Sequence, residues 1–232
     1  MLPLALWGQN ADVMPDVRAE SWSAAVFTFK LNESLNFNLE EQLRFKSGGK
    51  LYDRSFTQLK IEHTFMDAFE LGLGYRFIHL NDEEGNLQEM ETHRRWNYYF
   101  SGKFKVDRFS SKTRIQFQSR KEMVAGNNFF VNKARRYWRL KTALLYNIKG
   151  WKLDPKAGIE FFMRPREHSK GQYNKYRLML GTTWKLKGPH EIGFRYLFER
   201  ELKGWNPSVV YALDLRYHYT LKYKSKKKHK DE

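Results

Sequence analysis

The sequence contains no cysteine, little proline and no long apolar run. Its 232 residues include 0 Cys and 6 Pro. The lack of cysteine excludes disulfides, zinc–thiolate sites and cysteine nucleophiles. A membrane-spanning helix needs about 20 consecutive apolar residues, and no segment approaches that length. The chain is therefore not a helical membrane protein.

Aromatic and basic residues are abundant. Aromatics make up 16% of the chain and hydrophobic residues 41%, so there is ample apolar surface to bury and disorder is not expected. Lys and Arg number 42 against 26 Asp and Glu, which gives a formal net charge of +16. The length fits one domain, because β-barrels often run to roughly 200–250 residues.

From Ser21 onward the apolar residues recur with a period of two. In the segment 209–223, for example, Val, Leu and Tyr alternate with Asp, Arg, His, Thr and Lys. A strand places alternate residues on one face, whereas a helix would scatter them around its axis. The pattern predicts strands near 21–31, 35–45, 56–65, 69–80, 93–106, 110–120, 135–148, 151–164, 173–186, 190–199 and 208–223.

The connections between these strands alternate in length. Short turns are predicted at 32–34, 66–68, 107–109, 149–150 and 187–189, and longer polar loops at 46–55, 81–92, 121–134, 165–172 and 200–207. Short connections at one end and long ones at the other are typical of an up-and-down antiparallel transmembrane β-barrel. We expect 10–12 strands and prefer 12, because bacterial single-chain barrels have even numbers.

The chain divides into four predicted segments. Residues 1–8 resemble the end of a signal peptide, and residues 21–223 form the barrel. Residues 9–20 either supply a twelfth strand, against which Pro15 argues, or lie in the lumen. Residues 224–232 form a basic tail that would lie in the periplasm, so nucleic acid is not an expected partner despite its composition.

The apolar face of the predicted strands has aromatic residues at its ends. Amphipathic rings favour the boundary between membrane and water, so these residues predict an aromatic girdle. The alternative is the core of a soluble β-protein, but such a core does not require an equally long polar face on each strand. The predicted girdle includes Trp22, Trp96, Trp151, Trp184 and Tyr223.

The polar face is predominantly basic and is predicted to line the lumen. Its basic members are Arg44, Arg76, Arg95, Arg114, Arg120, Arg139, Lys141, Arg164, Arg177, Arg195 and Arg216. Its carboxylates are Glu40, Glu62, Glu70, Asp154, Glu160, Glu191 and Asp214. These charges either form ladders that brace the barrel or line a path for anions.

The position of residues along the strands predicts two zones in the lumen. Most of the inward arginines fall toward the long loops. Inward glycines fall toward the short turns, where they relieve curvature or leave space. We therefore expect a basic vestibule above a roomier lower lumen that contains Gly72, Gly74, Gly181 and Gly193.

The sequence gives little sign of catalysis, and no cofactor or metal site is predicted. It contains no P-loop, dinucleotide-binding fingerprint, metalloprotease motif or EF-hand loop. His79 and Ser119 both face outward near one end of the predicted barrel, but on strands that are not neighbours. We therefore do not expect an enzyme.

Several short motifs resemble a known family. They are the strand that opens with Trp22, the segments Leu39–Arg44 and Leu71–Arg76, and the run Arg135-x-Tyr137-Trp138-Arg139-Leu140. In these the chain resembles the Bacteroidota outer-membrane β-barrels classified as a domain of unknown function, number twenty-four ninety. The resemblance covers nearly everything after residue 20. It implies an outer-membrane location, and it implies no established activity or functional residues.

These observations predict a monomeric outer-membrane barrel that acts as a narrow, porin-like pore for small anionic solutes. The alternative is a plugged barrel with a structural role or one that scaffolds partner proteins. A lipid-modifying outer-membrane enzyme is a third, weaker hypothesis. The expected surroundings are outer-membrane lipid and lipopolysaccharide, together with other outer-membrane or periplasmic proteins.

Overall fold

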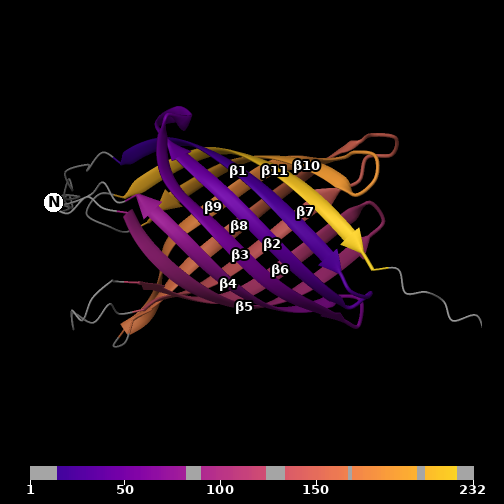
Figure 1. Ribbon diagram of the computed structural model, residues 1–232, viewed down its shortest axis with the longest axis horizontal. Coiled ribbons are helices and arrows are strands. Elements are labelled where there is room, and N and C mark those ends of the chain that lie inside the picture. The colour runs from indigo at the N-terminus through magenta and orange to yellow at the C-terminus, as the bar shows by residue number, and fades with distance from the viewer. Residues whose placement is uncertain (1–14, 82–89, 124–133, 167–168, 203–206, 224–232) are drawn as a thin grey trace, which may run out of the picture.

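A computed structural model describes residues 15–81, 90–123, 134–166, 169–202 and 207–223, which form one closed sheet of 11 strands (Figure 1). The strands are β1 (Asp16–Lys30), β2 (Leu35–Lys46), β3 (Leu51–Phe65), β4 (Phe69–Asn81), β5 (Met90–Val106), β6 (Phe109–Glu122), β7 (Arg135–Tyr146), β8 (Leu153–Arg166), β9 (Ser169–Lys185), β10 (His190–Glu201) and β11 (Ser208–Lys222). A short 3-10 turn, η1 (Ser47–Gly49), joins β2 to β3. Among the described residues, no helix has the length and apolar character to cross a membrane.

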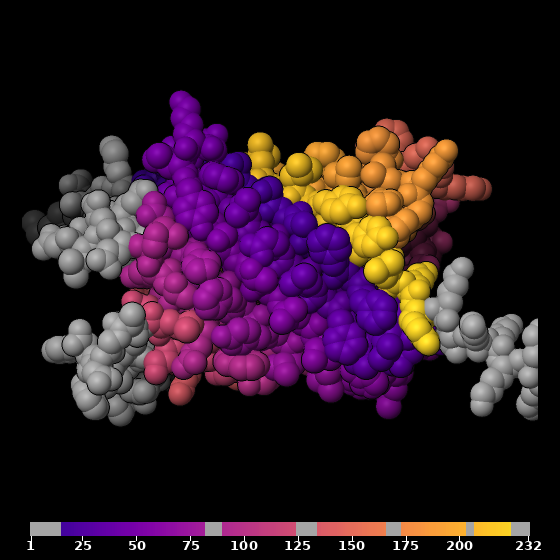
Figure 2. Space-filling model, in the orientation of Figure 1, coloured from indigo at the N-terminus to yellow at the C-terminus, as the bar shows by residue number. Residues whose placement is uncertain are grey.

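The barrel closes through a parallel pair. Each strand is antiparallel to the next along the chain, but β1 pairs in parallel with β11, from Asp16 opposite Ser208 to Lys30 opposite Lys222. In Figure 2 the indigo N-terminal strands lie directly against the yellow C-terminal strand. An odd number of up-and-down strands makes the first and last run in the same direction, so the closing pair has to be parallel.

The preference for 12 strands was therefore wrong. β11 is paired on one side with β10 and on the other with β1, which leaves no edge for a further strand. The expected separate segment 9–20 is also corrected in part, because residues 16–20 continue β1. Residues 9–14, the predicted signal-peptide remnant 1–8 and the tail 224–232 lie outside the described residues.

The two ends of the barrel carry different connections. Residues 31–34, 66–68, 107–108, 147–152 and 186–189 join strands at one end, which we call the turn end. Residues 47–50, 82–89, 123–134, 167–168 and 202–207 join them at the other, the loop end. The expected long loops 46–55 and 165–172 were wrong, because β3 begins at Leu51, β8 extends to Arg166 and β9 begins at Ser169. The register skips Asp53 in β3, and it skips Pro165 in β8 and residues 170–171 in β9. These irregularities interrupt the period of two and conceal the strands from the sequence pattern.

The barrel buries polar groups and exposes apolar ones. The largest side chains with less than 2% exposure are Gln42, Asn97, Asp53 and Ser101. Outward-facing Leu213 is 66% exposed and Leu180 is 61% exposed, and large apolar residues are exposed on every strand from β1 to β11. This arrangement is the reverse of a soluble core, where polar residues lie outside.

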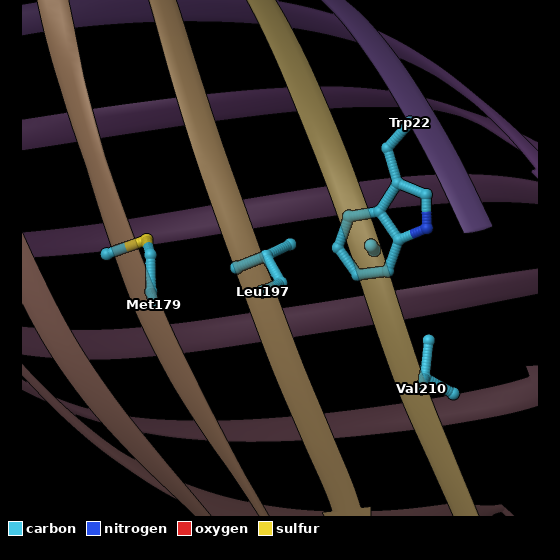
Figure 3. Packing of buried hydrophobic residues seen from close by; sticks show 5 residues of the cluster. Trp22, Met179, Leu197 and Val210 are labelled. Carbon is cyan, nitrogen blue, oxygen red and sulfur yellow. The ribbon is translucent and has the colours of Figure 1, made fainter. Parts of the chain in front are cut away.

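One part of the lumen is apolar. Trp22 on β1 packs with Met179, Leu197, Val210 and Ala212 from β9, β10 and β11. Figure 3 shows Trp22, Met179, Leu197 and Val210 of this cluster from close by. The prediction of Trp22 in an outer aromatic girdle was therefore wrong. Even-numbered residues of β1 point inward. Both faces of this strand carry apolar residues, so the sequence alternation does not show which face points into the lumen.

Candidate functional site

Two neighbouring chambers occupy the lumen. The first, which we call the central chamber, has a volume of about 350 Å³ and is lined by residues of every strand from β1 to β11. The second, the turn-side chamber, has a volume of about 710 Å³ and is lined chiefly by β5, β6, β7 and β8. Arg114 and Lys141 line both chambers and therefore mark the boundary between them.

Three carboxylate-centred networks cross the lumen. In the first, Glu40 lies 3.0 Å from Arg216 and 3.4 Å from Lys60. Arg216 also contacts Asp214 at 3.2 Å, and Asp214 in turn pairs with Arg195. Asp214 is 2% exposed, so this network holds charges that water scarcely reaches.

The second network runs around β7, β8, β9 and β10. Arg139 Nε donates to Glu160 at 2.9 Å, and Arg177 lies 3.3 Å from the other oxygen of the same carboxylate. Arg177 Nε also donates to Glu199 at 2.9 Å, and Lys175 donates to Glu199 at 2.8 Å. Charges of opposite sign thus alternate from strand to strand, which braces the barrel.

The third network lies beside the turn-side chamber. Glu70 accepts from Lys112 at 2.9 Å and from Arg114 at 3.2 Å, and Lys103 lies 3.5 Å away. One carboxylate therefore faces three cations, so this region keeps a positive charge even after pairing.

Aromatic faces and amides support several arginines in place of carboxylates. The Arg76 guanidinium lies 3.4 Å from the Phe56 ring centre, and its Nε donates to Gln58. The Arg44 guanidinium lies 3.7 Å from the Trp22 ring centre, while the Trp22 indole donates to Glu20 at 2.6 Å. Stacking on a ring holds a guanidinium in place without neutralising it.

Other lumen cations lack an ion pair. Within the described ranges, no ion pair and no hydrogen bond to a carboxylate is formed by Arg95, Arg120, Arg135, Lys141 or Lys156. The first four of these line the central chamber, and Lys156 lines the turn-side chamber with Lys141. The lumen thus combines braced pairs with an uncompensated positive charge.

The predicted basic residues can now be placed. The central chamber is lined by Arg44, Arg76, Arg95, Arg114, Arg120, Arg139, Lys141, Arg177, Arg195 and Arg216. Arg164 is instead exposed and does not line either chamber, so its prediction was wrong. It lies near the loop end of β8, two residues beyond Phe162, which is the last residue of that strand to line the central chamber.

The predicted carboxylates fall into different environments. Glu40, Glu70, Glu160 and Asp214 anchor the networks described above, and Glu62 accepts a hydrogen bond from Tyr99. Asp154 accepts from the Ile148 backbone N–H at 3.0 Å and so stabilises the connection between β7 and β8. Glu191 is half-buried on β10 near the turn end.

The remaining aromatic residues of the predicted girdle lie outside. Trp96, Trp151, Trp184 and Tyr223 are all exposed. Inward aromatic residues were missed by sequence reasoning, namely Phe56, Tyr99 and Phe162. Only for Tyr99 was there a signal in the sequence. Tyr99 lies directly opposite Gly72 in the register, and a large side chain opposite a glycine indicates that the ring packs over it.

The predicted lower lumen is not formed by the inward glycines. The turn-side chamber does not include Gly72, Gly74, Gly181 or Gly193. The Tyr99 ring occupies the space over Gly72, and Gly181 is covered by Arg195. These two glycines accommodate neighbouring side chains and do not provide an open passage.

Replacing Gly72 with alanine is expected to destabilise the barrel by about 1–3 kcal/mol, because the new methyl group overlaps the buried Tyr99 ring. Gly193→Ala is the matched control: a Cβ there has its nearest neighbour at 3.7 Å. Equilibrium unfolding in denaturant, followed by tryptophan fluorescence, measures the free energy of unfolding of both variants. Equal stability of the two variants would show that the Tyr99 ring does not pack over Gly72.

A small group of potential metal ligands lies at the loop end. Side-chain ligand atoms of Glu91, His93 and Glu122 lie within 4.8 Å of one another. His93 Nε2 is already 2.7 Å from Glu91, as expected of a hydrogen bond. Arg120 and Arg135 are close in the register and disfavour a cation, so the hydrogen bond accounts for the arrangement.

No curated protein matches the chain. Among solved structures, the crystal structure of the β domain of the Bordetella autotransporter BrkA is similar, with a TM-score of 0.49, 12% identity, and coverage of 81% of this chain and 84% of that one. The profile of a family described as protein of unknown function (DUF2490) matches residues 19–205. Since that match spans most of the sequence, the chain belongs to the DUF2490 family.

Proposed function

We propose that the protein is an integral outer-membrane β-barrel that conducts small anions through its basic lumen. The observation that carries the membrane part is the reversal of burial, with Gln42, Asn97 and Asp214 enclosed while leucines and aromatics are exposed around the barrel. A soluble monomer rarely exposes a contiguous apolar surface of this extent, whereas hydrocarbon favours it.

The strand dimensions and the two ends support this location. The strands range from 12 residues in β2 to 17 in β5, enough for the ~9–11 residues that a tilted strand needs to cross a bilayer. In the proposed topology the turn end faces the periplasm, the loop end faces outward, and outer-membrane lipid and lipopolysaccharide surround the barrel. Exposed Trp96, Trp151, Trp184 and Tyr223 would lie near the membrane interfaces.

The unpaired lumen cations support anion conduction. Arg95, Lys141 and Lys156 line the two chambers and make no ion pair within the described part of the chain. A ring of uncompensated positive charge lowers the energy of an anion and raises that of a cation in a narrow lumen. The shared boundary at Arg114 and Lys141 would be the selective constriction.

Planar-bilayer recording of the folded full chain tests this function. In a KCl gradient, the reversal potential is expected to show chloride selectivity. The triple variant Arg95→Glu, Lys141→Glu, Lys156→Glu is expected to select for potassium, because it inverts the unpaired charge without breaking a described carboxylate pair. Lys50→Glu, an exposed substitution between β2 and β3, is the control with unchanged selectivity. Absence of channel events from correctly folded protein contradicts the pore.

The second candidate is a plugged barrel with a structural or scaffolding role for other outer-membrane or periplasmic proteins. It is favoured by the dense networks around Glu40, Glu160 and Glu199, which fill much of the lumen. Silent bilayers together with full stability of the charge-reversed variant would support it. A lipid-modifying activity has less support, because His79 on β4 and Ser119 on β6 are separated by β5.

A further inference from the structure

A row of arginines crosses four neighbouring strands in direct register. Arg76 on β4 lies opposite Arg95 on β5. Arg95 in turn lies opposite Arg120 on β6, and Arg120 lies opposite Arg135 on β7. All line the central chamber, and we call them the arginine row.

Such a row is costly in an isolated barrel. Directly opposed residues have Cβ atoms about 4.5–5.5 Å apart, and like charges at that distance destabilise a sheet. Elsewhere in the same lumen, residues of opposite charge face one another: Lys141 is opposite Glu160, and Glu160 is opposite Arg177. The fold thus alternates charges where it braces β7 to β9, but not where the arginine row runs.

The described residues supply little hydrogen-bonding compensation for this charge. The buried Nε atoms of Arg95 and Arg120 have no hydrogen-bond partner among the described residues. Arg76 donates to the neutral amide of Gln58 and stacks on Phe56. Guanidinium groups held in place, enclosed and only partly hydrogen-bonded are well suited to receive an external anion.

The row also has an open end. Arg135 is the first residue of β7, at the loop end, and its side chain is exposed. Arg95 and Arg120 are half-buried, and Arg76 lies midway along β4. The charges therefore descend from the rim into the central chamber.

We propose that the arginine row is a binding site for an anion that carries phosphate groups and enters from the loop end. A phosphate accepts paired hydrogen bonds from the planar guanidinium fork, which chloride cannot do. The repeat of about 5 Å between opposed side chains suits a ligand with two adjoining phosphates. This inference rests on the proposed function in one respect, that the lumen admits anions from outside.

Calorimetric titration of the detergent-folded full chain with inorganic pyrophosphate tests the site. The variant Arg95→Gln, Arg120→Gln is expected to bind roughly tenfold more weakly or worse, because it removes charge-assisted hydrogen bonds. Lys105→Gln is the matched control, because Lys105 lines the turn-side chamber, away from the arginine row, and this variant is expected to leave the affinity unchanged. Pyrophosphate binding unaffected by the double variant, or no binding to the wild type, overturns the proposal.

Thermal unfolding gives a second readout that a purely structural role would not produce. In phosphate-free buffer the double variant is expected to unfold at a higher temperature than wild type, since repulsion is relieved. Pyrophosphate is expected to raise the unfolding temperature of wild type and of Lys105→Gln, but not that of the double variant. A double variant that is less stable than wild type in phosphate-free buffer contradicts the argument from repulsion.

Competition identifies the source of the phosphate. Displacement of pyrophosphate by lipopolysaccharide micelles supports a lipid-borne ligand at the same row, and displacement only by soluble phosphates supports a free one. Bilayer recordings separate this site from the pore. Chloride conductance without pyrophosphate binding overturns the site and retains the pore, while binding without conductance retains the site and overturns the pore.

Discussion

Replacing Asp214 with alanine is expected to lower the free energy of unfolding by about 3–5 kcal/mol, the usual cost of breaking a buried ion pair from one side. Asp214 is 2% exposed and is the partner of both Arg195 and Arg216. Its removal leaves two inward guanidinium groups with less compensation, and Glu40 is then the one carboxylate among the described residues that pairs with Arg216. Equilibrium unfolding of protein folded into lipid vesicles measures the loss.

Two further variants provide a control and a partial rescue for this experiment. Asp107→Asn changes an exposed carboxylate in the turn between β5 and β6, at a positive φ that asparagine tolerates, and is expected to alter stability by less than about 0.5 kcal/mol. Adding Arg195→Met to Asp214→Ala is expected to recover part of the loss, because one stranded charge disappears. A loss below about 1 kcal/mol for Asp214→Ala would mean that water screens this network, as it does surface pairs.

Placing arginine on the outer face at mid-barrel is expected to be costly in a bilayer. Leu213 faces outward from the interior of β11 with 66% of its surface exposed, so Leu213→Arg places a charge in hydrocarbon and is expected to cost about 2–4 kcal/mol. Leu221 lies on the same face of the same strand but next to its end, so Leu221→Arg is expected to cost about 0–1 kcal/mol.

The comparison between these two variants is the direct test of membrane insertion. Both residues are already exposed, so arginine fills no cavity and breaks no described pair. If this face were exposed to water, neither substitution should change the free energy of unfolding by more than about 0.5 kcal/mol. Equal and small effects for both variants in vesicles would therefore contradict insertion of this face into lipid.

The strands themselves could be predicted from the sequence because one face is apolar and the other polar. The period of two located β4 and β11 within a residue or two of their ends. It failed for Trp22, since Ala24 and Val26 on the inner face of β1 are as apolar as Ala25 and Phe27 on the outer face. It also failed at Arg164, because the alternation does not show how far along β8 the central chamber extends.

The number of strands and the way in which the barrel closes could not be predicted from the sequence pattern. The pairing of β1 with β11 joins residues nearly 200 positions apart, and no local signal records it. The odd number of strands follows from that one pairing. Sequence reasoning relied instead on the even numbers usual in bacterial barrels, which is a property of other proteins and not of this chain.

The arginine row shows which part of a site a sequence can reveal. The tight turn at 107–108 fixes the register of β5 and β6, so the pairing of Arg95 with Arg120 could have been read from it. Arg76 meets Arg95, and Arg120 meets Arg135, only across the connections 82–89 and 123–134. Connections of that length do not set a register, so the complete row could not be predicted.

The parallel pairing of β1 with β11 places the start of the first strand and the end of the last strand at opposite ends of the barrel. β1 begins at the loop end, and β11 finishes at the turn end (Figure 1). A peptide tag inserted just before Asp16 and another inserted just after Lys222 would therefore emerge on opposite faces of the bilayer. In a barrel with an even number of strands both tags would share one compartment, so antibody access to intact cells distinguishes the two architectures.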